Sequence, residues 1–302
     1  MNEHEITCPL CKHSDILPIH NKVRNITDNS SRMYECTYCQ THFLYPQPPP
    51  DQIEEYYDGQ FREEVHSASY YNKERLDSIF SKFSPEAHLR VSRIEKFLEN
   101  TDELLEIGCS VGYFLKAVSD KVKLAYGTEW DSRARAYVSE VLADSRIRTE
   151  KNPQDFNMQF DKIFLFHVLE HIADPIHFLE GLKPLLKKNG KLYIEVPNVD
   201  DVMVKTFRCN AYKDFYYKKA HLYNFNETGL KFIFEQCGLL YDIQFIQRYD
   251  ISNHFYWLAN NSPGGNGFYR ELLPAPVNDA YVNALIKAKQ SDTLFAVVTL
   301  PQ

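Results

Sequence analysis

The chain has 302 residues, 44% of them hydrophobic and 25% charged, close to the averages of soluble globular proteins. No run approaches the ~18 apolar residues that a membrane-spanning helix needs, and residues 1–5 lack the basic and apolar regions of a signal peptide, so a cytoplasmic protein without a membrane partner is expected. The formal net charge of −7 gives no global attraction for a polyanion, which disfavours nucleic acid as a partner.

Residues 1–45 hold two C-x-x-C pairs, formed by Cys8, Cys11, Cys36 and Cys39. Two such pairs offer four thiolates, the ligand set of a tetrahedral structural zinc site. The polar segment between them cannot build a core, so bound Zn²⁺ would supply much of its folding free energy. We therefore expect a small N-terminal zinc-binding module. His13 and His42 are alternative ligands, and redox chemistry is an alternative use of the cysteines.

Residues 46–84 are predicted to form a linker and a helical lid. The proline-rich stretch from Pro46 to Pro50 is typical of a stiff, extended connector. Beyond it the chain has an unusual density of aromatic residues: Tyr56, Tyr57, Phe61, Tyr70 and Tyr71. They either pack a helix against the core or cover a ligand. Ser84 as N-cap, with Pro85 at the first helical position, predicts that the next helix starts there.

Residues 85–302 are predicted to form the main domain. The expected strands begin at 103 and then span 122–128, 146–149, 162–166, 191–196, 240–246 and 293–300. The expected helices span 113–119, 131–143, 174–188, 227–237 and 278–289, with Asn189-Gly190 ending the third of them. Such alternation predicts an α/β fold, a doubly wound, Rossmann-like and mostly parallel sheet of seven strands.

The stretch 197–225 breaks this regularity. Its aromatic residues are interleaved with lysines and an arginine. Because it follows the fifth strand, it opens at the carboxyl edge of the sheet, the side on which doubly wound folds bind ligands. We therefore expect a substrate-binding insert there.

The strand that begins at Glu103 runs into a glycine turn and then into an amphipathic helix. Gly108 and Gly112 bracket the turn, where a Cβ would obstruct either the chain or a ligand. A dinucleotide fold requires G-x-G-x-x-G, but Ser110 and Tyr113 occupy its second and third glycine positions. Glu106, just before the first glycine, indicates another nucleotide-like ligand.

The order Glu106, Gly108, Gly112 resembles motif I of the class I S-adenosylmethionine-dependent methyltransferases. The resemblance continues at 126–129 and at 167–175. It implies that S-adenosylmethionine is the cofactor and that its methionine part lies against the loop formed by Glu106, Gly108, Cys109, Ser110 and Gly112.

The other predicted cofactor contacts come from the ends of later strands. Glu129, followed by Trp130, ends the second strand, where a carboxylate can accept hydrogen bonds from both ribose hydroxyls. Asp155, or Asn152, would meet the adenine amino group. His167 follows the fourth strand and would either line the cofactor pocket or act as an acid or base.

His221 and Tyr223 match positions at which similar sugar methyltransferases carry a catalytic histidine or tyrosine. Because His221 comes from the insert that should hold the acceptor, it is the first choice for general base, with Tyr223 orienting it. His167 is the alternative base.

The N-terminal cysteine pairs with this core also resemble the C-methyltransferases of deoxysugar biosynthesis, which continue into a further large domain. Only residues 241–302 follow Leu240 here. We therefore expect methylation of a hydroxyl or amine of a sugar or glycan precursor, with C-methylation of a keto sugar as an alternative. Another alternative is an RNA base methyltransferase with a zinc module. The bases of the RNA would then stack on the aromatic and basic residues of 205–219. An inactive cofactor-binding scaffold is the third.

Overall fold

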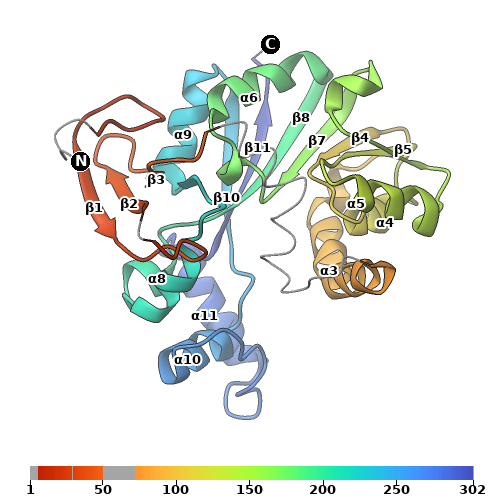
Figure 1. Cartoon of the computed structure of the whole chain (residues 1–302). Coiled ribbons are helices and arrows are strands. Elements are labelled where there is room, and N and C mark those ends of the chain that lie inside the picture. Colours follow the sequence, from red (N-terminus) through yellow and green to blue (C-terminus); the bar gives the residue numbers. More distant parts are fainter. Residues whose placement is uncertain (1–5, 29, 50–71, 302) are drawn as a thin grey trace. The chain divides into compact units, whose positions relative to one another are not determined.

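The computed structural model describes residues 6–28, 30–49 and 72–301 (Figure 1). Within this part of the chain, seven strands form one sheet in the order β10-β11-β8-β7-β4-β5-β6. Its strands are β4 (Glu103–Ile107), β5 (Leu124–Thr128), β6 (Ile147–Glu150), β7 (Phe160–Phe166), β8 (Leu186–Pro197), β10 (Leu240–Ile246) and β11 (Thr293–Thr299). The pairs β4–β5, β4–β7 and β5–β6 are parallel. The first of these strands along the chain, β4, lies inside the sheet, and later strands are added on both sides of it. This order confirms the predicted doubly wound, Rossmann-like sheet.

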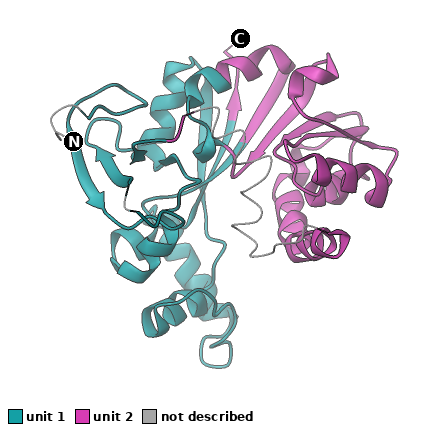
Figure 2. Ribbon diagram, viewed as in Figure 1, with its two compact units in different colours: residues 1–47, 169–178, 194–297 teal, residues 48–168, 179–193, 298–302 magenta. Residues whose placement is uncertain are grey.

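The chain forms two compact units (Figure 2). Residues 1–47, 169–178 and 194–297 make unit 1, and residues 48–168, 179–193 and 298–302 make unit 2. The residues of the predicted zinc module therefore fall in the same unit as the predicted substrate insert. The glycine loop falls in unit 2.

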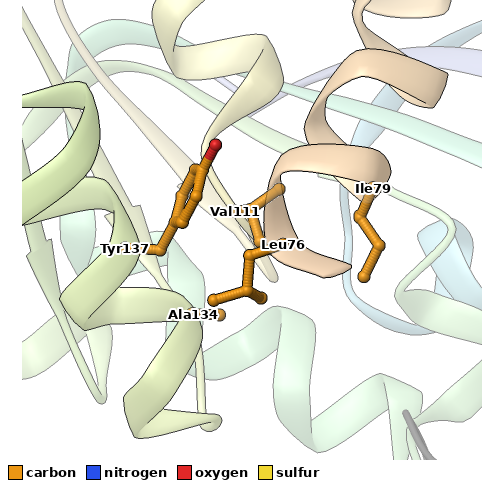
Figure 3. Close-up of a cluster of buried hydrophobic side chains, with 5 residues drawn as sticks. All are labelled: Leu76, Ile79, Val111, Ala134 and Tyr137. Atoms are coloured by element: carbon orange, nitrogen blue, oxygen red, sulfur yellow. The ribbon is translucent and has the colours of Figure 1, made fainter. Parts of the chain in front are cut away.

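Unit 2 packs three helices around the glycine loop. These are α3 (Lys73–Ile94), α4 (Tyr113–Val118) and α5 (Ser132–Tyr137). Figure 3 shows the apolar cluster in which Leu76 and Ile79 of α3 meet Val111 of the loop and Ala134 and Tyr137 of α5. The Tyr137 hydroxyl also donates to Asp77 Oδ1 at 2.7 Å, which ties α5 to α3. The helix before the sheet thus buttresses the loop from its apolar side.

The helix predicted to start at Ser84 is instead part of α3. Pro85 lies inside this helix, although it cannot donate an interior hydrogen bond. Ser84 Oγ donates to the Phe80 carbonyl at 2.7 Å, so Ser84 is an interior residue rather than a cap. The buried stripe continues through the proline, from Leu76 to Ile94, and its packing offsets the missing bond.

The predicted ends of two other helices are also wrong. The helix expected over 131–143 begins after its N-cap Asp131 as predicted, but changes to a π-helical turn at Val138–Leu142. The helix expected over 174–188 ends earlier. Here α6 (Pro175–Leu182) gives way to a 3₁₀ turn at Lys183–Leu185, which contains Pro184, and β8 already begins at Leu186. Asn189, with φ of 67°, therefore lies within a strand.

Unit 1 contains a second sheet, with four strands among the described residues. Its order is β1 (Ile16–His20), β2 (Arg32–Cys36), β3 (His42–Tyr45) and β9 (Tyr223–Asn224). The first three form an antiparallel meander. The fourth comes from the predicted insert and pairs antiparallel with β3, so that Phe43 lies opposite Tyr223. The cysteine-bearing segment and the insert therefore share one hydrogen-bonded ladder.

The helices of unit 1 include α7 (Val202–Lys205), α8 (Asn210–Tyr216), α9 (Glu227–Gln236), α10 (Ile251–Asn260) and α11 (Ala275–Lys287). The stretch 197–225, predicted as irregular, thus contains two short helices and a strand. Asn226 caps α9 by accepting from the Gly229 N–H at 2.9 Å. A Cβ at Gly229 would lie 2.5 Å from Oγ1 of Thr41, so glycine lets the cysteine-bearing segment approach α9 closely.

The aromatic residues proposed to form a lid, Tyr56, Tyr57, Phe61, Tyr70 and Tyr71, lie outside the described residues. Of the helices that the structure does describe, none is both long and apolar enough to span a bilayer.

Candidate active site

The loop between β4 and α4 turns on three residues with left-handed backbone. Gly108, Ser110 and Gly112 have φ values of 73°, 53° and 75°. Gly112 is the N-cap of α4, and a Cβ there would lie 2.9 Å from Cγ2 of Val138. An L side chain at this position would therefore be strained by both its φ and that neighbour. The end of β4 consequently presents main chain, rather than bulky side chains, to a ligand.

Glu129 is fixed against this loop by two main-chain N–H groups. The N–H of Ser110 donates to its Oε2 at 2.9 Å, and the N–H of Asp131 donates to its Oε1 at 3.0 Å. Each carboxylate oxygen can accept further hydrogen bonds, such as those from two vicinal hydroxyls. The structure thus places Glu129, which is predicted to bind the ribose, against the glycine loop, which is predicted to bind the methionine part.

Cys109 and Trp130 contribute mainly through their backbones. Cys109 is buried, and its N–H donates to the Thr128 carbonyl at 2.8 Å, which joins the loop to the end of β5. The carbonyl of Trp130 accepts from Arg135 Nη1 at 2.8 Å. The first contact fixes the ends of β4 and β5 relative to each other, and the second holds the chain after β5 against α5.

Glu106 lies at the base of the loop and is only 2% exposed. Its Oε2 has no hydrogen-bond partner among the described residues. Burial raises the pKa of Glu106 to about 8, against the opposing effect of Arg90 and with a smaller contribution from Glu129. A buried, unpartnered carboxylate oxygen is costly unless a donor reaches it. A ligand ammonium group, such as that of a methionine moiety, would provide such a donor.

Two predicted cofactor residues are less closely tied to this loop. Asp155 is exposed, and its Oδ2 accepts at 2.9 Å from the N–H of Asn152, which is the N-cap of a short 3₁₀ helix. His167 follows β7 directly, is half-buried and has φ of 57°. Because β7 is parallel to β4, His167 emerges at the same sheet edge as the glycine loop. The contacts of both residues with a cofactor stay predictions.

The four cysteines of unit 1 converge on one point. Each pair is followed by a residue with left-handed backbone, Lys12 or Gln40. The N–H groups of these residues donate to the carbonyls of Cys8 and Cys36, at 2.9 Å and 2.8 Å. All four sulfur atoms lie within 4.8 Å of one another, with Cys8–Cys39 at 3.8 Å and Cys11–Cys36 at 3.4 Å. Tetrahedral zinc with Zn–S bonds of about 2.3 Å places its sulfurs about 3.8 Å apart, so the donor set fits the ion.

The two histidines near these cysteines have other contacts. The His13 ring stacks on Tyr38, with centroids 4.7 Å apart. His42 Nδ1 lies 2.9 Å from the Tyr217 hydroxyl, and burial lowers the pKa of His42 to about 3. Neither belongs to the cysteine cluster.

A separate cluster of ionisable side chains lies elsewhere in unit 1. It joins the 3₁₀ helix Leu169–His171 to the segment after α8. Glu170 is fully buried and His221 is 6% exposed, with Glu170 Oε1 3.9 Å from His221 Nε2. The imidazoles of His171 and His221 meet edge to face, with centroids 4.9 Å apart. Such a cluster can accept, hold or release a proton.

Tyr223 is fully buried in β9. Its hydroxyl donates to the Ala173 carbonyl at 3.0 Å. It therefore ties β9 to the chain that follows the Leu169–His171 turn, and it supports the segment that carries His221. Any orienting effect on His221 is exerted through that segment.

A family model described as a methyltransferase domain matches residues 58–242, more than half of the chain. The chain belongs to the methyltransferase-domain family. This match agrees with the order of the strands in the sheet and with the glycine loop, so the chain contains a methyltransferase domain.

Curated relatives of this methyltransferase are tRNA U34 carboxymethyltransferases. The one from Campylobacter jejuni (strain ATCC 700819) is 24% identical over 136 residues, which cover 42% of this chain and 47% of the relative. The one from Aeromonas hydrophila is 26% identical over 175 residues, which cover 53% of this chain and 52% of the relative. The chain thus spans about half the length of the curated relatives it matches.

Solved structures align with most of the chain. The putative methyltransferase crystallised with the Haloferax volcanii Trm112 activator aligns with a TM-score of 0.50 at 14% identity, over 78% of this chain and 100% of that one. A S-adenosylmethionine-dependent methyltransferase from Archaeoglobus fulgidus aligns with a TM-score of 0.48 at 16% identity, over 71% of this chain and 93% of that one.

Sequence reasoning missed two charged residues of this methyltransferase's unit 1 cluster. Glu170 was visible beside His171, but nothing in the sequence places either residue against His221, some 50 positions later. Lys218 was counted among the basic residues of the insert. Burial lowers its pKa to about 8, while Glu170 opposes that effect. The available signal for this cluster in the sequence was the H-x-Y-x-F pattern that begins at His221, with Lys218 three residues before it.

Proposed function

We propose that the enzyme binds S-adenosylmethionine through Glu129, on the ribose, and through Glu106 and the glycine loop, on the methionine part. The buried, unpartnered oxygen of Glu106 is the observation that supports a cationic group at this place. Bound S-adenosylmethionine supplies an electrophilic methyl group. The chain would orient the cofactor through Glu129, whose carboxylate is held by the N–H groups of Ser110 and Asp131.

His221 is proposed as the general base that removes the acceptor's proton. Its imidazole faces a carboxylate and is nearly buried, so its orientation is fixed. General-base catalysis typically contributes about 10²–10⁴-fold to the rate. His167, at the end of β7, is the alternative base. Tyr223 positions the backbone that carries His221, through its bond to Ala173.

The acceptor is proposed to be RNA, the alternative that the sequence ranked second. The curated relatives are named for a tRNA nucleotide, which supports this acceptor. A surface feature of unit 1 supports it as well. The guanidinium carbon of Arg24 lies 4.0 Å above the ring of Phe215, which is 40% exposed and backed by Trp257. Such arginine–aromatic pairs can stack on unpaired bases.

A sugar or glycan precursor is the second candidate acceptor, methylated at a hydroxyl, an amine or, in a keto sugar, a carbon. The net charge of −7 favours it, because it gives no general attraction for a polyanion. So does the burial of His221, which suits a small acceptor more readily than a helical one.

An assay with methyl-labelled S-adenosylmethionine separates these candidates. The purified protein is offered total RNA from a strain lacking it, and in parallel a panel of nucleotide sugars. Label in RNA that disappears in the Arg24→Ala and Phe215→Ala variants supports the RNA acceptor. Label only in a sugar overturns it. Cofactor binding with no label in either pool would indicate a scaffold without activity.

The four cysteines are proposed to hold one structural zinc in residues 1–45. Thiolate ligands require a reducing compartment, which supports a cytoplasmic location. Elemental analysis of untagged protein should find one zinc per chain, and Cys36→Ser should lose the metal and lower the thermal midpoint. Cys237→Ser is the matched control, since this buried thiol follows α9 outside the cluster. Metal-free protein of unchanged stability would contradict the site.

A further inference from the structure

Glu170 and His221 form a carboxylate–imidazole pair inside unit 1. The carboxylate is fully buried, and its Oε1 lies 3.9 Å from Nε2 of an imidazole that is 6% exposed. This separation allows an ion pair once the ring is protonated. Catalytic contacts are often long in ligand-free structures and shorten in the reacting complex.

Backbone contacts fix both partners. His171 Nδ1 lies 2.6 Å from the Ala220 carbonyl, so this nitrogen carries the proton and the bond ties the carboxylate's turn to the imidazole's segment. At the other end, the N–H of His221 donates to the Lys218 carbonyl at 2.9 Å. The pair is therefore held by main chain on each side.

Among the described residues, His171, Lys218 and Tyr216 are groups that act on the pair. Burial lowers the pKa of Lys218, an effect that Arg24 and Arg248 increase and Glu170 opposes. Burial also raises the pKa of Tyr216, and Glu170 is among the charges that add to this. One nitrogen or oxygen from each of Glu170, His171 and His221 lies within 4.8 Å of the others, a spacing that could hold a cation. The lysine and arginine charges act against a divalent ion there.

We propose that Glu170 is the positioning residue for His221: its carboxylate sets the orientation of the imidazole and stabilises the imidazolium that forms during methyl transfer. This inference rests on the proposed role of His221 as general base. It adds Glu170 as the residue that orients His221 and balances the positive charge of its protonated ring.

The transfer step moves one proton and one methyl group. In the tautomer whose Nε2–H faces Glu170 Oε1, Nδ1 is the basic nitrogen of His221. The acceptor's X–H bond breaks and its proton moves to Nδ1, while the electron pair of X forms the new bond to the methyl carbon. The carbon–sulfur bond breaks, and its electrons remain on sulfur as a neutral thioether. Glu170 stays ionised and faces the new positive charge.

The first test requires no acceptor. Protein labelled at histidine Cε1 is titrated by NMR, and the His221 signal is assigned from the His221→Asn spectrum. In Glu170→Gln the midpoint of the His221 titration should fall by about 1 pH unit or more, because an opposite charge nearby has been removed. Glu227→Gln is the matched control, a paired carboxylate on α9 whose loss should leave the midpoint unchanged. An unchanged midpoint in Glu170→Gln overturns the proposal, as does displacement of the His221 signal by Zn²⁺ or Mg²⁺ at micromolar concentration.

The second test is a double-mutant cycle on turnover, with the acceptor that the labelling assay identifies. Glu170→Gln alone should lower kcat roughly 10–100-fold, within the range of general-base effects, and leave the cofactor dissociation constant unchanged. In the His221→Asn background it should have no further effect. Independent, multiplicative losses would overturn the positioning role while preserving the base. Wild-type turnover of His221→Asn would instead refute the base assignment itself.

Discussion

The glycine loop of unit 2 and the cluster of Glu170, His171 and His221 in unit 1 are built in different ways. The loop comes from one stretch of chain between β4 and β5, and its key contacts are main-chain N–H groups that hold Glu129. The cluster is made of side chains from two segments about 50 residues apart, brought together by the bonds of His171 and Tyr223. The first arrangement tolerates changes of most side chains. The second depends on each of its members.

From this contrast we expect the largest loss of turnover on substitution of His221. His221→Asn should lower turnover by roughly 10²–10⁴-fold, the usual contribution of a general base, while leaving cofactor affinity nearly intact. Steady-state kinetics and calorimetry measure the two quantities. His177→Asn, an exposed histidine of α6, is the control that should change neither. If His167→Asn abolishes turnover and His221→Asn does not, the base lies at the end of β7.

Glu106 should give effects of opposite sign on stability and on binding. Its folded-state pKa of about 8 lies above the ordinary 4.5, so its contribution to stability is present below pH 4.5 and is lost as the pH rises toward 8. Ligand-free Glu106→Gln should therefore match the wild type at pH 4.5 and be more stable at pH 9. The gain should be a few kcal/mol at most, because each tenfold change in a protonation equilibrium corresponds to ~1.4 kcal/mol. The same variant should bind S-adenosylmethionine more weakly.

Urea unfolding at the two pH values measures this effect. Glu103→Gln provides a control of opposite sign, because Lys123 and Lys187 lower the pKa of Glu103. That substitution should destabilise the protein at pH 9. Equal stability of Glu106→Gln and wild type at pH 9 would mean that Glu106 already has a donor.

Glu129 should contribute a smaller effect on cofactor binding. Glu129→Ala removes a charge-assisted hydrogen bond worth roughly 1.5–3 kcal/mol, so calorimetry should show at least a tenfold weaker cofactor complex. Glu140→Ala, at an exposed position of the same unit, should have no effect. An unchanged dissociation constant in Glu129→Ala would remove the residue from the ribose site.

The smallest predicted effect tests the backbone of the loop. Gly112→Ala places a Cβ at φ of 75° and against Val138, which should cost about 1–2 kcal/mol of unfolding free energy. Gly181→Ala is the matched control: on α6 a Cβ would meet nothing within 4 Å, and alanine should stabilise that helix slightly. Similar behaviour of the two variants would show that the loop is not strained.

Sequence patterns predicted what is local. The glycine loop, Glu129 and the sheet depend on residues close in sequence, and the alternation of elements was predicted correctly even where boundaries were wrong at Pro85 and Pro184. At Pro85 tertiary packing outweighed the usual interpretation of proline, whereas the helix before Pro184 ends as that interpretation requires. The Glu170–His221 pair could not be predicted, because it depends on how the chain after α8 returns to the turn after β7. The convergence of the cysteines was predictable from their spacing alone.

The pairing of β9 with β3 has a consequence for the order in which the protein is made. The first 45 residues leave the ribosome early, but the edge of β3 gains its partner only after residue 224 has been synthesised. Until then the nascent chain carries an unpaired strand edge, the kind of surface that attracts wrong partners. Metal loading before that moment would secure the cysteine turns without closing the ladder. Pausing synthesis before or after residue 224, followed by limited proteolysis of the nascent chain, would show whether the N-terminal sheet becomes protected only at the later stage.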